Sequence, residues 1–253
     1  MSDFFSRSEQ VLGREAMARL AAARVLVVGI GGVGSWCAEA LVRTGLGRIV
    51  MVDDDRVAES NVNRQCPATA KTVGRPKVEV MAERLREISP GADVEGRATR
   101  FGRPTDGTPR LDEGAGDWRG FDAVVDAIDS VDCKAELILG ATAAGVPLVS
   151  SMGAAFRKDP TKVRVTRFED VRGDGLARAL RQRFKRLGRF PARPFACVWS
   201  GEPASRPSAR KDPSSSPPKG SLMQVTATFG MCLASAVVAR VTAPGDTFAD
   251  FLV

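Results

Sequence analysis

Short apolar runs alternate with amphipathic stretches along the first 155 residues of the chain. The runs predict buried parallel strands over residues 24–28, 48–52, 121–126 and 147–150. Apolar residues at helical spacing predict helices over residues 7–23, 34–44, 76–89 and 131–145. Strands that alternate with helices predict a doubly wound, mostly parallel α/β sheet with helices on both of its faces.

The alternation stops in two segments. Residues 102–120 are rich in Gly, Asp, Pro and Thr and predict a loop. Residues 201–220 are dense in Pro and Ser and poor in apolar side chains, so we expect a flexible loop there. Residues 221–242 return to helical spacing and predict a packed C-terminal helix, which extends the α/β unit. We interpret residues 1–253 as one domain.

The composition fits this architecture and adds an expected location. The chain has 253 residues, of which 43% are hydrophobic and 26% charged, which suits one domain of the doubly wound type. No apolar run reaches the length of about 20 residues that a membrane span needs, and residues 1–6 lack the pattern of a secretory signal. We therefore expect a cytoplasmic protein without a membrane partner.

The reactive side chains exclude several kinds of chemistry. The chain contains no histidine, which removes Ser-His-Asp triads, Cys-His dyads and histidine metal sites. Its five cysteines are scattered, and no two have metal-ligand spacing. A disulfide framework and a structural zinc site are therefore not expected.

A glycine-rich turn follows the first predicted strand and begins the next helix. Its glycines are Gly29, Gly31, Gly32 and Gly34, and such a turn lets the backbone approach a phosphate closely. Asp53 ends the second strand, 19 residues past Gly34, where an acid that binds a ribose is expected. This pattern predicts a Rossmann-like nucleotide-binding fold, and it fits a nicotinamide dehydrogenase equally well.

The residues after Asp53 favour a triphosphate over a dinucleotide. Arg64 and Lys77 supply two cations that the β- and γ-phosphates of ATP need and that a pyrophosphate does not. Asn61 offers hydrogen bonds near the same place. Asp129 follows the strand at 121–126, at the end where open α/β sheets bind ligands, and a carboxylate beside a triphosphate commonly holds Mg²⁺.

Four motifs in this order resemble one family. They are Gly-x-Gly-Gly-x-Gly, Asp-x-Asp-x-Val-x-x-Ser-Asn-x-x-Arg-Gln, Val-Gly-x-x-Lys and Asp-x-x-Asp, and they lie within about 100 residues. Together they are similar to the ATP-dependent adenylyltransferase domain of the ubiquitin-activating superfamily. The resemblance implies the following contacts: ribose by Asp53, phosphates by Asn61, Arg64 and Lys77, and Mg²⁺ by Asp129.

The resemblance also concerns the N-terminus. It implies a homodimer in which an N-terminal arginine, best matched by Arg7, reaches the phosphates of the neighbouring subunit's site. Asp55 either contacts the nucleotide or holds the loop that presents Arg64. Cys66 is the one thiol near these residues, and a neighbouring cation could lower its pKa, but a catalytic role is not favoured.

Further motifs resemble one branch, the tRNA threonylcarbamoyladenosine dehydratases. They include Gly-Gly-Val-Gly-Ser-Trp at 31–36, Asp-Ala-Ile-Asp-Ser at 126–130, and Val-Thr-Ala-Thr-Phe-Gly at 225–230. This branch implies adenylation of a carboxylate on the tRNA, followed by ring closure with release of AMP. Two alternatives stay open: an enzyme that activates the C-terminus of a ubiquitin-like or sulfur-carrier protein, and a nucleotide-binding partner of a sulfur-transfer protein.

A basic stretch indicates the macromolecular partner. Residues 176–193 contain seven basic and no acidic residues on an amphipathic helical pattern, in a chain of net charge +7. A helix surface of one sign favours a nucleic-acid backbone over a merely solvated face, so we expect tRNA to bind there. The residues expected to reach phosphates together are Arg178, Arg181, Lys185 and Arg189.

Overall fold

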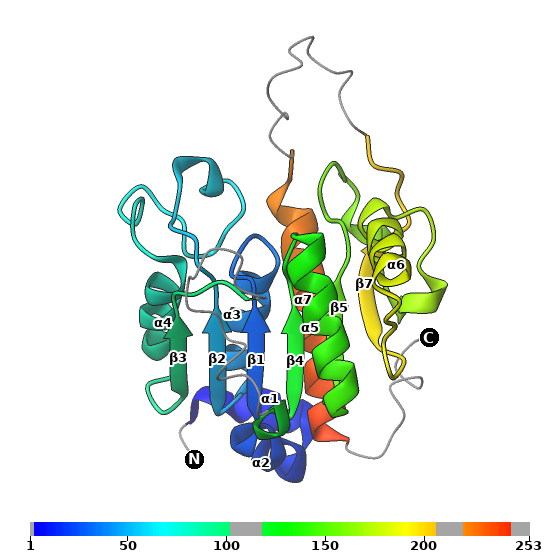
Figure 1. Cartoon of the computed structure of the whole chain (residues 1–253). Coiled ribbons are helices and arrows are strands. Elements are labelled where there is room, and N and C mark those ends of the chain that lie inside the picture. Colours follow the sequence, from blue (N-terminus) through cyan, green and yellow to red (C-terminus); the bar gives the residue numbers. More distant parts are fainter. Residues whose placement is uncertain (1–2, 102–117, 206–219, 244–253) are drawn as a thin grey trace.

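One seven-stranded sheet forms the centre of the molecule (Figure 1). The structure is a computed structural model that describes residues 3–101, 118–205 and 220–243. The strand order is β3-β2-β1-β4-β5-β7-β6, and all neighbours are parallel except β6 and β7. The strands are β1 (Arg24–Val28), β2 (Arg48–Val52), β3 (Asp93–Arg97), β4 (Ala123–Asp126), β5 (Leu148–Ser151), β6 (Val163–Arg167) and β7 (Ala196–Ser200).

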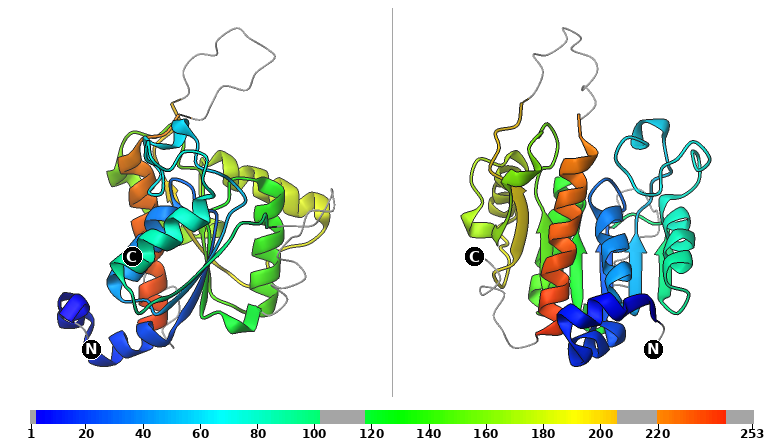
Figure 2. Two further views of the ribbon diagram at one scale, coloured as in Figure 1. Left: turned by 90° about the vertical axis from the view of Figure 1, so that its left-hand side faces the viewer. Right: turned by 180° about the vertical axis from the view of Figure 1, so that it is seen from behind.

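Helices cover both faces of the sheet, and two separate apolar clusters form between them and the strands (Figure 2). One face carries α3 (Gly34–Thr44), α4 (Lys77–Ile88) and α7 (Met223–Thr242). The other carries α5 (Val131–Ala144) and α6 (Gly175–Leu187). The first two helices, α1 (Ser6–Leu12) and α2 (Arg14–Ala22), lie below the sheet, at the amino ends of the strands. The predicted fold class is confirmed.

The predicted elements need two corrections. The helix expected over residues 7–23 is broken into α1 and α2 at Gly13, whose φ of 81° a helix does not allow. Strands β3, β6 and β7 were not predicted from the sequence. β3 and β6 lie at the two edges of the sheet and contain several exposed polar residues, so they lack an apolar run.

The C-terminal helix bears on the expectation that the chain has no membrane-spanning segment. Among the described residues, α7 is the one helix long and apolar enough to cross a membrane by length and composition, with a mean hydropathy of 1.5 over its best window. Half of that window is buried inside the protein, and α7 packs against α3 as part of the apolar core. Such a helix is weak evidence for a membrane segment, because core helices have the same composition.

The two predicted loops lie largely outside the described residues, but their ends are visible. Residues 118–120 form a 3₁₀ turn at the end of the first loop. On the two sides of residues 206–219, the chain meets the backbone of Phe156: its N–H donates to Gly220 O at 2.8 Å, and its carbonyl accepts from Ser205 N at 3.0 Å. Phe156 thereby fixes where this segment leaves and rejoins the fold.

Candidate nucleotide-binding site

The strand order creates a topological switch point between β1 and β4. From β1 the chain crosses to β2 on one side, and from β4 it crosses to β5 on the other, so the connections diverge above these two neighbours. In open α/β sheets, ligands bind at the carboxyl ends of such a pair of strands. The glycine-rich turn follows β1 and the turn that contains Asp129 follows β4, so the topology brings these two predicted segments together.

Two of the predicted glycines are required by the close packing of these turns. A Cβ on Gly29, which has a φ of 93°, would lie 2.7 Å from the carbonyl oxygen of Ala127. A Cβ on Gly34 would lie 1.8 Å from the carbonyl oxygen of Gly29. The glycine loop 29–34 therefore packs against the turn after β4 and leads directly into α3, whose first N–H groups have no side-chain cap. Such a helix start favours an anion.

Asp53 ties the end of β2 to the glycine loop. Its Oδ2 accepts a hydrogen bond from Ile30 N at 2.6 Å, and its Oδ1 accepts one from Asp55 N at 2.9 Å. Burial raises the pKa of its carboxyl above the ordinary value, while Lys77 and the two N–H donors act against that rise. The structure places Asp53 beside the loop, as a ribose-binding acid requires, and its contact with a ribose stays a prediction.

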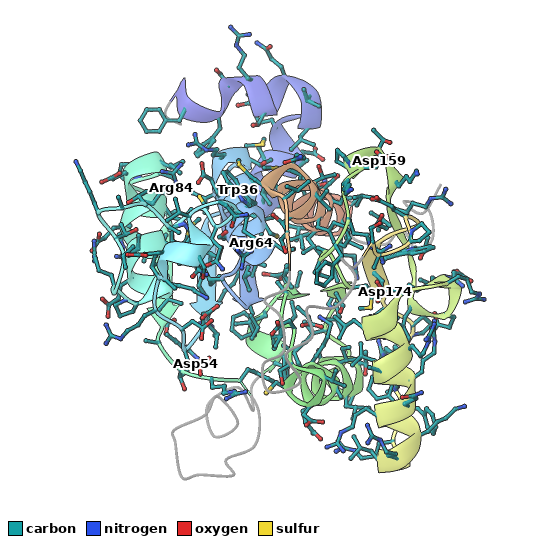
Figure 3. All side chains as sticks on the ribbon, turned by 90° about the horizontal axis from the view of Figure 1, so that it is seen from above. Trp36, Asp54, Arg64, Arg84, Asp159 and Asp174 are labelled. Carbon is teal, nitrogen blue, oxygen red and sulfur yellow. The ribbon has the colours of Figure 1, made fainter. Side chains whose placement is uncertain are left out.

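Arg64 lies across the glycine loop, close to Trp36 (Figure 3). A Cβ built on Gly32 would lie 3.2 Å from Cγ of Arg64. The guanidinium Nη1 donates to the carbonyl of Ser60 and to Oδ1 of Asn63, both at 2.8 Å. The indole N–H of Trp36 donates to the Arg64 carbonyl at 2.9 Å, so helix α3 fixes the backbone of this residue. The predicted cation is therefore beside the predicted phosphate loop.

The other predicted phosphate ligands are engaged with their own loop. Lys77 is buried and its ammonium lies 2.6 Å from Oδ2 of Asp55, and the backbone N–H of Lys77 donates to the Asp55 carbonyl. Of the two hypotheses for Asp55, this contact favours the one in which it holds the loop. Asn61 is also buried, and its Oδ1 accepts from Ala58 N at 3.1 Å. Its amide N–H group keeps donor capacity for a ligand.

The turn that presents Asp129 is fixed by a buried ion pair that sequence analysis missed. Lys134 and Asp126 are both fully buried, with Nζ 2.9 Å from Oδ2. Lys134 Nζ also donates to the carbonyl of Ile128 at 2.9 Å, and Oδ1 of Asp126 accepts from Ile128 N at 3.2 Å. Ser150 on β5 donates to the same carboxylate at 2.7 Å. Both backbone polar groups of the residue before Asp129 are thus held, and Asp129 itself is exposed.

A sequence signal for Lys134 existed. It lies on the same helical face as Ile138 and Ala141, which are core residues of α5. A lysine on an apolar face requires a buried partner, because an unpaired buried charge is strongly unfavourable. Asp126, the last residue of the predicted strand, was the available carboxylate.

The structure gives Cys66 no lowered pKa, which agrees with the interpretation that it is not catalytic. Its Sγ donates to Oε2 of Glu39 at 2.7 Å, and burial together with this carboxylate raises the pKa of the thiol to about 12. The nearby cations, Arg84 and Arg43, are themselves bonded to Glu39 at 2.6 and 2.8 Å. The cysteine is therefore a neutral hydrogen-bond donor to a buried carboxylate and has no activated thiolate.

Arg7 does not approach the site of its own chain. It is exposed on α1, below the amino ends of the strands, whereas the glycine loop lies beyond their carboxyl ends (Figure 1). Any role of Arg7 at a phosphate therefore requires a second subunit, and this role stays a prediction.

The predicted basic helix exists, but its best set of cations needs correction. Residues 175–187 form α6, and residues after Gly188 continue as an irregular segment toward β7. Arg181 Nη2 donates to the carbonyls of Phe168 and Val171 at 2.8 and 2.9 Å, so Arg181 is structural. Arg189 lies 3.3 Å from Glu136, which partly neutralises it.

The fold and the site together define a nucleotide-binding α/β protein of the adenylyltransferase type, with a glycine loop at the switch point between β1 and β4 and an arginine across it. A family model described as the ThiF family matches residues 5–253, and the chain belongs to this family.

Individual relatives point to one branch of the family. The chain is 36% identical over 263 residues to tRNA threonylcarbamoyladenosine dehydratase of Escherichia coli (strain K12), a match that covers 94% of this chain and 93% of that protein. It is 39% identical over 184 residues to the protein of the same name from Bacillus subtilis (strain 168), over 73% of this chain and 70% of that one. The crystal structure of the E. coli dehydratase in complex with ATP matches with a TM-score of 0.82 at 36% identity, over 95% and 96% of the two chains.

Proposed function

We propose that the protein is an ATP-dependent dehydratase that adenylates the carboxylate of N6-threonylcarbamoyladenosine in tRNA and then closes a ring with release of AMP. The observation that carries the proposal is the position of Arg64, whose side chain lies across Gly32 of the phosphate loop in a chain so similar to proteins of that name. A guanidinium beside this loop would stabilise the charge that develops during adenylation.

Each chemical step follows from the groups at the switch point. A carboxylate oxygen of the substrate attacks the α-phosphorus of ATP, an oxygen–phosphorus bond forms, and pyrophosphate leaves. Arg64 and the N–H groups at the start of α3 stabilise the phosphate charge, and Asp53 orients the ribose. A nitrogen or oxygen of the same threonylcarbamoyl group then attacks the acyl carbon, and AMP leaves with the attacking oxygen of the first step. Intramolecular attack needs position more than a strong base, which suits a chain without histidine.

Mg²⁺ fits this site through Asp129. Asp53, Asp54 and Asp55 also bring three carboxylates within 4.8 Å of one another, and Asp53 and Asp55 bind N–H groups and Lys77. Asp129 is an exposed carboxylate on a rigid turn beside the phosphate loop, which is the donor type that Mg²⁺ takes alongside phosphates. When bound, the ion neutralises the phosphate oxygens.

The enzyme acts as a homodimer in this proposal. Exposed apolar side chains occur on α1 and along the outer side of α7, with Val11 84% and Met231 45% exposed. Helix α2, which follows α1, is bonded to the end of α7, because Arg19 on α2 donates to the carbonyl of Thr242. A two-fold contact through this face covers the apolar residues and carries Arg7 toward the neighbouring site.

Mixing inactive subunits tests the dimer and Arg7 together. A dimer of one Arg7→Ala subunit and one Arg64→Ala subunit contains one site with both arginines intact if Arg7 serves its neighbour. Each single variant is expected to lose about 10²–10³ in turnover, the usual effect of removing one charge-stabilising group. Mixing the two by subunit exchange is expected to restore activity, and a mixture as inactive as its components would contradict the crossing of Arg7.

The tRNA substrate approaches along α6, which lies beside the carboxyl ends of the strands (Figure 1). Arg178, Lys185 and Arg186 are exposed on this helix, and no acidic partner of theirs is found among the described residues. These three replace the predicted set as the cations available to phosphates. A tRNA substrate also supports a cytoplasmic location.

The proposed activity has a direct assay. The purified protein is incubated with ATP, Mg²⁺ and tRNA that carries threonylcarbamoyladenosine, and the nucleosides are then analysed by mass spectrometry. Loss of one water from the modified nucleoside, dependent on ATP and absent with Arg64→Ala, is the expected result. Unchanged nucleoside in the presence of a well-folded protein that binds ATP would overturn the proposal and favour a carrier protein as the substrate.

A further inference from the structure

An exposed aromatic ring stands immediately after the basic helix. The side chain of Phe190 is 62% exposed, and it is surrounded in sequence by Arg186, Arg189 and Arg193. A single exposed apolar side chain is common on protein surfaces and needs no explanation by itself. Its position among cations does require an explanation, because charged neighbours oppose burial of the ring in an ordinary apolar contact with another protein.

The backbone that carries Phe190 is fixed on both sides. Gly188 ends α6 in the left-handed conformation, with a φ of 61°, and Arg189 N donates to the carbonyl of Phe184 at 3.3 Å. Two residues beyond the ring, Ala192 N donates to Oγ1 of Thr142 on α5 at 3.2 Å. Pro191 restricts the backbone between these contacts. The ring is therefore presented by an ordered turn, so it loses little conformational entropy when it binds a partner.

The apolar side of α6 cannot serve as an alternative contact surface. Ala177, Leu180 and Phe184 are buried in the core cluster between α6, α5 and the sheet. An amphipathic basic helix binds a membrane by inserting such a face, and here that face is already used inside the protein. Of the large apolar residues described in residues 175–195, only Phe190 is strongly exposed.

We propose that Phe190 is a stacking platform for an unpaired base of the RNA substrate, flanked by cations that hold the adjoining phosphates. This inference rests on the proposed function and adds where the RNA is recognised. Single-stranded loops expose base faces that aromatic side chains stack upon, whereas duplex RNA offers only its backbone and grooves. A ring and cations on one ordered surface therefore select a loop, and this surface follows the end of α6 and packs against the C-terminal end of α5.

Measurements of RNA-hairpin binding distinguish the contribution of the Phe190 ring to affinity from the contribution of the charged side chains. Affinities of the full-length protein for a stem–loop with a seven-nucleotide loop and for a blunt duplex of equal length are measured by fluorescence anisotropy at several salt concentrations. Phe190→Ala and Phe190→Leu are expected to weaken stem–loop binding by about tenfold, within the range for loss of one stacked base, and to leave the salt slope unchanged. Phe190→Trp retains the affinity, and duplex binding is the same for all of these variants.

Charge variants supply the matched comparison. Lys185→Glu combined with Arg186→Glu is expected to lower the salt slope by about two units for both RNAs, since each lost phosphate contact lowers it by nearly one. Arg48→Glu, on β2 at the far side of the sheet from α6 (Figure 1), changes neither the slope nor the affinity. Stem–loop affinity of Phe190→Ala equal to that of wild type, or an equal loss for the duplex, would overturn the platform. Binding of wild type but not of Phe190→Ala to vesicles with 30% phosphatidylglycerol, without any effect on RNA, would assign the ring to a lipid surface instead.

The two proposals fail in different ways. If ATP-dependent loss of water from the nucleoside is seen and Phe190→Ala binds the stem–loop as wild type does, only the platform is wrong. If no water is lost with any RNA, the proposed function is wrong, whatever the binding data show.

Discussion

Two buried carboxylates lie on opposite faces of the sheet, and they differ in how far water reaches their partners. Glu39 on α3 is bonded to Arg84 and Arg43, whose side chains are 43% and 56% exposed. Asp126 at the end of β4 is bonded to Lys134, and water reaches neither of them. The first cluster keeps its cations hydrated and stabilises the fold, whereas the second requires two desolvated charges.

The difference indicates what each cluster does. A buried ion pair often stabilises a fold no more than apolar side chains of the same volume would, so stability does not account for Asp126 and Lys134. Both residues instead bind the backbone of Ile128, which precedes Asp129. We infer that the Asp126 pair positions the turn that carries Asp129, the proposed Mg²⁺ ligand, and that the Glu39 cluster anchors α4 and the loop at Cys66 to α3.

The largest effect is expected from breaking the buried pair on one side only. Lys134→Ala leaves an unpaired carboxylate in the core and should lower the free energy of unfolding by about 3–5 kcal/mol, measured by urea denaturation. The double variant Asp126→Leu, Lys134→Met should stay within about 2 kcal/mol of wild type, because neither charge remains. Its turnover should nevertheless fall by about tenfold or more, since the turn at Ile128 loses both bonds. Wild-type turnover in the double variant would contradict a positioning role.

A smaller, pH-dependent effect is expected at Glu39. Burial acts to raise the pKa of its carboxyl, but hydrogen bonds from Arg84, Cys66 and Arg43 outweigh burial and lower the pKa to about 2. A lowered pKa stabilises the fold above the unfolded-state value near 4.5, and this contribution is lost as the pH falls toward 2. Glu39→Gln should therefore be less stable than wild type by up to about 3 kcal/mol at pH 7. Urea denaturation at pH 7, 5 and 3.5 should show the gap narrowing below pH 4.5, and a constant gap would count against the assignment.

The smallest effect is expected at Cys66. With a pKa of about 12, its thiol should stay unmodified by iodoacetamide at pH 8 in the folded protein, as followed by peptide mass spectrometry. Cys66→Ser keeps a donor to Glu39 and should change turnover by less than about threefold, since the thiol takes no part in the chemistry. Rapid alkylation that abolishes turnover would restore the cysteine as a candidate nucleophile.

Burial also determines how much of the fold could be predicted from the sequence. Strands β1, β2, β4 and β5 lie inside the sheet, and their burial on both faces makes them apolar runs that the pattern identifies. The glycine loop was found because glycine at fixed spacing reports a backbone constraint. Edge strand β6, by contrast, has the sequence Val-Arg-Val-Thr-Arg, in which apolar and polar residues alternate, so a search for continuous apolar runs misses this half-exposed strand.

Side-chain partners could be predicted less well than positions along the chain. Lys77 was expected at a phosphate from its spacing, and its pairing with Asp55 depends on how the loop folds back. Arg181 was counted among the exposed cations, yet carbonyls of a preceding turn hold it. Helical spacing gives the face of a residue but not what neighbouring segments bring to that face.

The central claim is that the substrate carboxylate attacks ATP at the site crossed by Arg64. Transfer of oxygen tests it most directly: tRNA whose threonylcarbamoyl carboxylate is labelled with ¹⁸O is converted with ATP in ordinary water, and the AMP is analysed by mass spectrometry. Adenylation followed by ring closure leaves one carboxylate oxygen on the phosphorus, so AMP with one ¹⁸O atom is expected. Unlabelled AMP, with the label lost to water or kept in the nucleoside, would contradict the account.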